Sequence, residues 1–330
     1  MILDKKLNSG SKIILDGGTG SEVEKKGGKM SSAWGALANI YSSEIVINIH
    51  EEFINSGCDI ITTNTYATSR HCLEAEGHGD KTIEINKMAV NNAKLAIEKA
   101  DCGRPIAIAG SMSSHYALSK NEFRPDPKFV PSLKQVEKNY KEIATILCDS
   151  GVDFLLLEAV LDIEHAQLLL NAALELKLPV WVGISCCINK FDNSVIGRNF
   201  LAEKTPHLIN QPKDLIETPK FLPKDEIISL DKIINSLTII GGDVYGIMHS
   251  NIEDTNEALT ILKQNWRGPM MIYPEIHFFD TKTGGAIITA SKEEYVNACM
   301  NWLNSGIQII GGCCGVSSNY IRELKESINY

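Results

Sequence analysis

Short apolar segments recur along the whole chain, and more polar segments with a helical period separate them. Most of the apolar segments are hydrophobic nearly throughout rather than alternating, which is typical of strands buried on both faces of a parallel sheet. We expect eight such strands, at residues 12–18, 59–66, 105–112, 153–159, 179–186, 244–250, 269–275 and 307–314.

The intervening segments predict helices. Apolar residues recur in them at three- and four-residue spacing, for example at Ile85, Ala89 and Ala93. Several predicted helices end at a glycine just before the next strand, as expected for a left-handed C-cap; these glycines are Gly57, Gly151 and Gly306. Alternating strands and helices allow a closed barrel or an open doubly wound sheet, and eight strands favour the closed (β/α)8 TIM barrel. The DGGTGSE segment lacks GxGxxG spacing, so dinucleotide binding is not favoured.

We expect residues 1–330 to form a single barrel domain with one long insertion. Residues 188–225 follow the fifth predicted strand, contain four of the eleven prolines and show little periodicity. A loop of this length is either functional, such as a lid, or a plain surface insertion, and both possibilities stay open. Residues 113–132 form a second long loop, after the third strand.

Composition and charge narrow the class of protein. The chain of 330 residues is 44% hydrophobic and 22% charged, which is typical of a globular protein with a large core. Its net charge of −9, without a long basic run, argues against nucleic acid as a partner. No segment resembles a transmembrane helix or a signal peptide. Nine scattered cysteines then indicate reduced thiols, so we expect a cytoplasmic protein; oligomeric state does not follow.

Candidate chemistry gathers where the predicted strands end, which is where a barrel places its active site. The segment GGCCG (311–315) carries two adjacent cysteines, and His249 ends the sixth strand. Thiolates and imidazole are ligands that Zn²⁺ prefers, and a catalytic zinc keeps one position open. Adjacent side chains on a regular strand point to opposite faces, so both cysteines reach one metal only if the flanking glycines let the backbone turn. Taken alone, GGCCG is either a metal site or a tight turn with buried thiols.

The third metal ligand has two candidates at the same end of the barrel. His249 is one, and Cys186 or Cys187 after the fifth strand is the other. We favour His249. Three further histidines carry weaker expectations: His50 as a helix-surface residue, and His115 and His277 as residues of barrel-mouth loops that could touch substrate.

In combination, several segments resemble the homocysteine S-methyltransferase family. They are DGGTGSEVEKKG (16–27), residues 33–69 almost throughout, GSMSSHYA (110–117), LLLEA (155–159) and GGCCG (311–315), in the family's order. The resemblance covers nearly the whole chain apart from the long loop after the fifth strand. It implies a zinc-dependent transfer of a methyl group from a small donor to the thiol of homocysteine, giving methionine.

The resemblance also implies roles for particular residues. Cys313 and Cys314 would be zinc ligands, and His249 stands where the family has its third ligand, a cysteine. Asp16, Gly17 and Glu158 match positions that hold the amino group and backbone of homocysteine, while Trp34 and Thr63 match residues that line the pocket; these five are the expected substrate-binding residues.

The chain departs from the family pattern at the pocket. Ser113–Tyr116 replaces a Gly-Pro-Tyr-Gly segment, and Glu275 replaces the asparagine of a Tyr-Pro-Asn segment. Replacing one thiolate by His249 makes a zinc site with two thiolates neutral, where three thiolates would give −1. These differences leave open another thiol acceptor, a betaine-type donor, or a metal-binding barrel without catalysis. A small sulfonium donor such as S-methylmethionine fits a self-contained barrel best.

Overall fold

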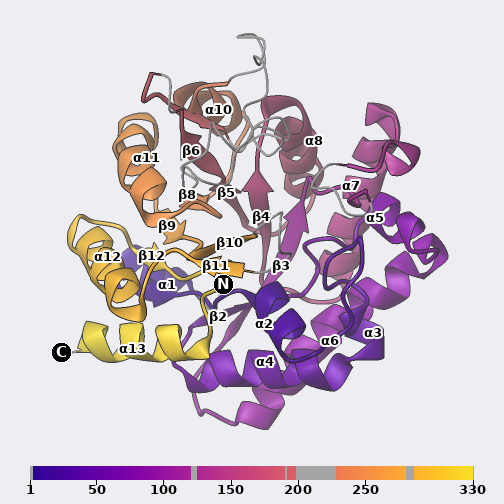
Figure 1. Ribbon diagram of the computed structural model, residues 1–330, viewed down its shortest axis with the longest axis horizontal. Helices are drawn as coiled ribbons and strands as arrows, with labels where there is room; N and C mark the ends of the chain where they lie inside the picture. The colour runs from indigo at the N-terminus through magenta and orange to yellow at the C-terminus, as the bar shows by residue number, and fades with distance from the viewer. Residues whose placement is uncertain (1–2, 120–124, 190–191, 198–227, 280–285, 330) are drawn as a thin grey trace.

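In a computed structural model, residues 3–119, 125–189, 192–197, 228–279 and 286–329 are described. Eight parallel strands line a nearly closed barrel, and helices surround it (Figure 1). The strands are β1 (Ile13–Ile14), β2 (Ile60–Thr62), β3 (Ala107–Ser113), β4 (Phe154–Val160), β5 (Val180–Ile184), β8 (Val244–Met248), β9 (Met270–Tyr273) and β12 (Ile309–Ile310). Each lies within or overlaps a predicted segment, so the prediction of a (β/α)8 barrel is confirmed.

The main helices follow the strands as the periodicity predicts. They are α1 (Asp4–Ser9), α2 (Thr19–Lys25), α3 (Ala38–Tyr41), α4 (Ser43–Asn55), α5 (Arg70–Ala75), α6 (Thr82–Ala100), α7 (Leu133–Asp149), α8 (Ile163–Leu174), α10 (Leu230–Thr238), α11 (Ile252–Asn265), α12 (Lys292–Asn304) and α13 (Ser318–Asn329). None of the helices in the described ranges is both long and apolar enough to cross a membrane.

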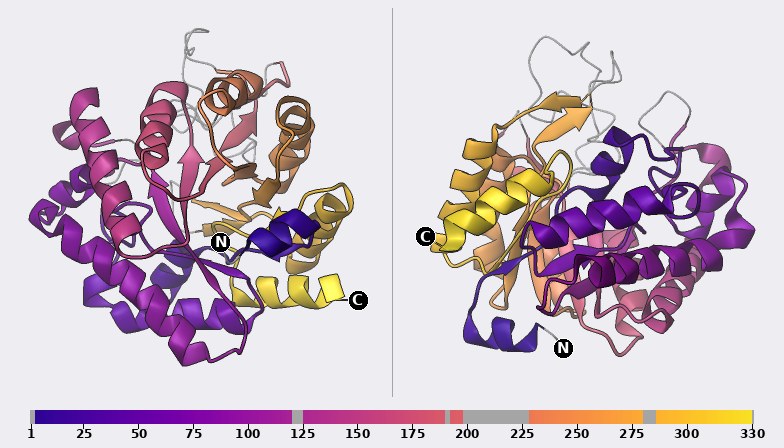
Figure 2. Two further views of the ribbon diagram at one scale, coloured as in Figure 1. Left: turned by 180° about the vertical axis from the view of Figure 1, so that it is seen from behind. Right: turned by 90° about the horizontal axis from the view of Figure 1, so that it is seen from below.

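Two short antiparallel hairpins extend the loops at the carboxyl end of the barrel. The first pairs β6 (Cys186–Ile188) with β7 (Val195–Gly197), and the second pairs β10 (His277–Phe279) with β11 (Ala286–Ile288). The first hairpin opens the predicted insertion at 188–225, most of which lies outside the described residues. Helix α1 lies at the opposite end of the barrel from the β10–β11 hairpin (Figure 2).

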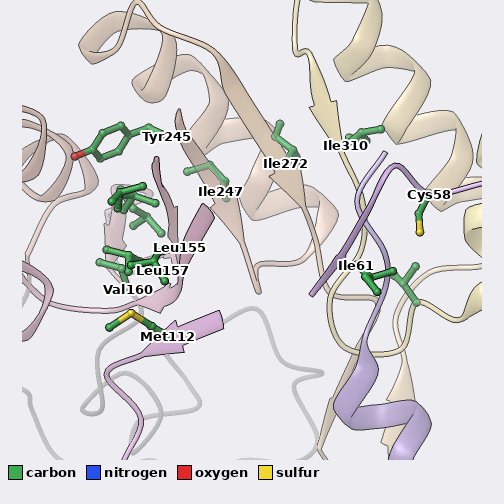
Figure 3. Close-up of a cluster of buried hydrophobic side chains, with 14 of the residues drawn as sticks. Cys58, Ile61, Met112, Leu155, Leu157, Val160, Tyr245, Ile247, Ile272 and Ile310 are labelled. Carbon is green, nitrogen blue, oxygen red and sulfur yellow. The ribbon is translucent and has the colours of Figure 1, made fainter. Parts of the chain in front are cut away.

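Alternation along the strands creates two separate cores. Because successive side chains of a strand point to opposite faces, one set fills the barrel and the other packs against the helices. The interior set includes Leu15, Ile60, Ala109, Phe154, Leu156, Trp181, Val244, Met271, Tyr273 and Ile309. The outer set includes Ile61, Leu155, Leu157, Tyr245, Ile247, Ile272 and Ile310 (Figure 3). Leu3, just before α1, and Leu7 within it belong to the interior cluster, so this helix closes the amino end of the barrel.

An aspartate immediately before a strand clamps that strand to its neighbour at three places. The Asp153 nitrogen donates to the carbonyl oxygen of Ile108 at 2.8 Å, and its carboxylate accepts from the nitrogen of Ile108 at 2.7 Å. Asp59 makes the same pair of bonds with Ile14, and Asp243 makes it with Val180. The Asp59 pair joins β1 to β2, the two strands at the ends of the sheet, and so helps to close the barrel.

Candidate metal and substrate site

Three side chains with metal-ligating atoms meet at the carboxyl end of the barrel. His249 follows β8, and Cys313 and Cys314 follow β12. Their ligand atoms all lie within 4.8 Å of one another. The Nδ1 atom of His249 is 3.6 Å from the sulfur of Cys313 and 3.7 Å from that of Cys314, and the two sulfurs are 3.8 Å apart.

These separations fit a tetrahedral metal ion. Zinc bonds of about 2.3 Å to sulfur and about 2.1 Å to nitrogen place two sulfurs about 3.8 Å apart and sulfur and nitrogen about 3.6 Å apart. The three ligand atoms therefore already have the spacing of three corners of such a site. The fourth corner is left for another ligand, as in catalytic zinc sites.

Backbone turns bring the two adjacent cysteines onto one side. His249 has a φ of 45°, and Gly315, directly after the cysteines, has a φ of 85°. The neighbouring loops are tied together, because the nitrogen of Cys313 donates to the carbonyl oxygen of Pro274 at 2.8 Å and the nitrogen of Ile276 donates to that of Cys314 at 3.0 Å. Loops after three adjacent strands, β8, β9 and β12, thus hold the cluster.

The two thiols differ in acidity. The pKa of Cys314 lies well below its usual value because the Cys313 thiol donates a hydrogen bond to it, and His249 and His277 add to the effect. The pKa of Cys313 lies well above its usual value, because its proton is held by Cys314 and because it is buried. A thiolate at Cys314 is the form that binds a metal ion.

Asp16 and Glu158 are two buried carboxyl groups, and Glu158 interacts electrostatically with Asp16 and with Cys314 and His249 of the cluster. Burial raises the pKa of each carboxyl group to about 7. Asp16 accepts hydrogen bonds from the nitrogen and hydroxyl of Thr62, and Glu158 accepts one from the Ser111 hydroxyl. In the described part of the chain these partners are hydroxyl and backbone groups, not lysine or arginine, so a cationic ligand would meet two uncompensated carboxyl groups.

The two ends of the chain interlock beside the cluster. The nitrogen of Gly312 donates to the carbonyl oxygen of Asp16, and the nitrogen of Gly18 donates to that of Val316, both at 3.0 Å. A Cβ on Gly17 would lie 2.1 Å from the Val316 carbonyl oxygen, so no larger residue fits there. The DGG and GGCCG motifs, almost 300 residues apart, therefore build one structure.

Thr63 contacts Ser111 on β3, and Trp34 packs against the start of α2. The Thr63 hydroxyl accepts from the nitrogen of Ser111, the residue whose hydroxyl binds Glu158. Trp34, with a φ of 52°, packs over Gly20 at the start of α2: a Cβ on Gly20 would lie 2.7 Å from its indole nitrogen. Thr63 thus supports the residue that orients Glu158.

Cys186 and Cys187, the alternative third ligands, lie on β6 and are outside the three-residue cluster. The backbone nitrogen of Cys186 donates to the Ser250 hydroxyl at 3.0 Å, and its sulfur is 3.5 Å from the same oxygen. As placed here, His249 and not either cysteine faces Cys313 and Cys314.

Sequence reasoning assigns no role to Thr62, Ser111 or Tyr273, whereas it names Glu275 and His115 as pocket residues. Thr62 and Ser111 bind the two carboxylates, and the Glu275 carboxylate lies 3.0 Å from Nδ1 of His249. The buried Tyr273 hydroxyl and Nε2 of His115 have no hydrogen-bond partner among the described residues. The position of these residues at strand ends could have identified them. Thr62 and Ser111 also lie two residues after the inward-facing Ile60 and Ala109, so their side chains point into the barrel.

Comparisons with known proteins agree on one protein family. The model of the homocysteine S-methyltransferase family matches residues 13–211 and 223–328. A selenocysteine methyltransferase of Astragalus bisulcatus is 24% identical over 98% of this chain and 94% of its own length. A betaine-homocysteine S-methyltransferase of Drosophila melanogaster is 25% identical over 100% of this chain and 98% of its own.

The fold has a solved counterpart. The metallated form of the homocysteine methyltransferase MmuM from Escherichia coli superposes with a TM-score of 0.73, covering 99% of this chain and 100% of that one. Sequence identity with it is 18%, so this likeness supports the barrel architecture.

Proposed function

The chain belongs to the homocysteine S-methyltransferase family, and on that premise we propose that it transfers a methyl group to the thiol of homocysteine, giving methionine, with zinc at the His249–Cys313–Cys314 cluster. The observation that carries the metal site is the spacing of its three ligand atoms, between 3.6 and 3.8 Å. Two thiols and an imidazole form a donor set suited to zinc.

Bound zinc would lower the pKa of the homocysteine thiol, so that the substrate reacts as a thiolate at neutral pH. The sulfur then attacks the methyl carbon of the donor. A carbon–sulfur bond forms as the donor's own bond to that carbon breaks. A sulfonium donor such as S-methylmethionine leaves as a neutral thioether, so the reaction needs no protein nucleophile.

Asp16 and Glu158 are the proposed anchors of the substrate ammonium group. Burial raises the pKa of both carboxyl groups to about 7, which means that ionising them without a cation is costly. A bound ammonium removes that cost and is held in return. Both side chains are placed by hydrogen bonds from Thr62 and Ser111, so little reorganisation is needed on binding.

The remaining expected residues take supporting roles in this proposal. Gly17, which is packed closely against Val316, is the proposed neighbour of the substrate backbone. Thr63 supports Ser111 beneath Glu158, and Trp34 packs over the start of α2. We also infer one barrel domain spanning residues 1–330, and a reducing, cytoplasmic location, since thiol ligands must stay reduced to bind metal.

Zinc analysis and a transfer assay test the proposal. Freshly purified protein should hold one zinc per chain and convert homocysteine to methionine with a sulfonium donor; trimethylammonium donors of the betaine type form the comparison arm. Less than one metal per chain would contradict the zinc site. Metal without methyl transfer from any donor would favour a binding barrel instead.

Variants separate the two candidates for the third ligand. Replacing His249 by alanine should abolish zinc retention, while Cys186→Ser and Cys187→Ser should keep both zinc and activity. Loss of zinc in either serine variant, with His249→Ala unaffected, would assign the third ligand to β6.

A further inference from the structure

Glu275 contacts His249 but is not one of the three clustered metal-ligating residues. The residue follows β9 and is 6% exposed, and its Oε2 atom lies 3.0 Å from Nδ1 of His249. Nδ1 is the same atom that faces the sulfurs of Cys313 and Cys314. Glu275 is nevertheless not a member of the group of ligand atoms that lie within 4.8 Å of one another.

The backbone around Glu275 is bound to both loops that carry ligands. Its nitrogen donates to the carbonyl oxygen of Ser250, next to His249, at 3.0 Å. The residues on either side of it, Pro274 and Ile276, are hydrogen-bonded to Cys313 and Cys314. The carboxylate is thus held at a fixed place relative to all three ligands.

The net charge of the metal site explains why the Glu275 carboxylate is useful beside His249. A divalent ion with two thiolates and a neutral imidazole carries no net charge, so the protein holds it less strongly than three thiolates would. The Glu275 carboxylate adds one negative charge beside the imidazole. In the metal-free protein the same carboxylate lies 3.0 Å from Nδ1, a contact that keeps the ring turned toward the cysteines.

Resting on the metal site of the proposed function, we propose that Glu275 is a positioning and charge-balancing residue: it holds His249 in register with Cys313 and Cys314 and supplies the negative charge that a third thiolate would provide. Its contribution depends on His249, because the imidazole is both the group it orients and the ligand whose neutrality it offsets.

The test is metal binding without substrate. Zn²⁺ affinity is measured by chelator competition, and Co²⁺ reports ligand geometry through its absorption bands. Glu275→Gln keeps the shape of the side chain but removes its charge, and should weaken Zn²⁺ binding by about 10- to 100-fold and alter the Co²⁺ spectrum. Glu142→Gln is the matched control, since it removes a carboxylate of α7 that is paired with Arg70 of α5.

A His249→Cys background makes the test specific. There a third thiolate supplies the charge and no imidazole needs orienting, so adding Glu275→Gln should cost less than about 3-fold in Zn²⁺ affinity. An equal loss in both backgrounds would overturn the proposal, because Glu275 would then act independently of His249. Unchanged affinity in Glu275→Gln would overturn it as well. Because no assay uses homocysteine or a donor, failure of methyl transfer would contradict the proposed function and leave this result intact.

Discussion

The carboxylate of Asp16 is bonded twice to Thr62, to its backbone nitrogen at 2.7 Å and to its hydroxyl at 2.8 Å. These bonds join the ends of β1 and β2, which share no regular ladder in the described part of the chain. Asp16 therefore helps to close the barrel, and it is also one of the two carboxyl groups that we propose to hold the substrate.

Replacing Asp16 by asparagine should affect both roles. The amide group cannot accept both bonds from Thr62, so we expect a loss of about 1–3 kcal/mol in the free energy of unfolding. Loss of the carboxylate should also raise the KM for homocysteine. Thr62→Val is the comparison: it removes one bond, should cost about 1 kcal/mol and should raise KM less than Asp16→Asn does, because the carboxylate remains. Urea unfolding and initial rates measure the two effects, and an Asp16→Asn protein of unchanged stability would contradict the closing role.

Stability of the metal-free protein should fall with rising pH because of Glu158. Burial raises the pKa of this carboxyl group from 4.5 to about 7, so its contribution is present below the unfolded pKa and is lost as pH rises through the folded one. From about pH 5.5 to about pH 8, wild type should lose about 2 kcal/mol relative to Glu158→Gln. Urea unfolding at both pH values measures this, and parallel pH profiles for the two proteins would refute it. Homocysteine should reduce the loss.

His50 should make the protein sensitive to acid. The sequence predicts a helix-surface residue, which is wrong: His50 is fully buried on α4, and neither ring nitrogen has a hydrogen-bond partner among the described residues. Burial lowers its pKa to about 4, so stability is lost as pH falls from the unfolded value of about 6.5 through 4.

His50→Leu should therefore be more stable than wild type by about 2 kcal/mol at about pH 5, with a smaller difference near neutral pH. His78→Leu serves as the control, since His78 lies beside Tyr41 on the outer surface. Thermal unfolding across this pH range tests the expectation. Equal acid sensitivity of His50→Leu and wild type would exclude His50 as the cause.

Gly183 on β5 leaves room for the ring of Tyr273. A Cβ at this position would lie 2.4 Å from the Tyr273 hydroxyl oxygen and 3.0 Å from Cγ of Met248. Gly183→Ala should cost about 1–3 kcal/mol through overpacking. Combining it with Tyr273→Phe removes the nearest atom and should recover most of that loss, as measured by urea unfolding. No recovery in the double variant would show that the strain lies elsewhere, at Met248 or in the backbone.

Local patterns were enough for the scaffold. A continuous apolar run such as 153–159 predicts a doubly buried strand because every side chain there must be covered, and β4 lies within one residue of that range. The same reasoning places Asp16, Glu158 and GGCCG at one end of the barrel, since parallel strands present their carboxyl ends together. It failed at His50, which the sequence predicts on a helix surface but which is fully buried in the structure.

The sequence by itself determined the eight strands, their order along the chain and the end of the barrel at which the polar and thiol residues gather. It could do so because burial imposes a pattern of apolar positions along the chain. Only the tertiary structure decided which side chains meet there. The left-handed turn at His249 aims its imidazole at Cys313, and hydrogen bonds between loops bring Glu275 to the same nitrogen. Such contacts depend on backbone angles and on pairing between distant strands, and neither can be predicted from the local pattern of residues.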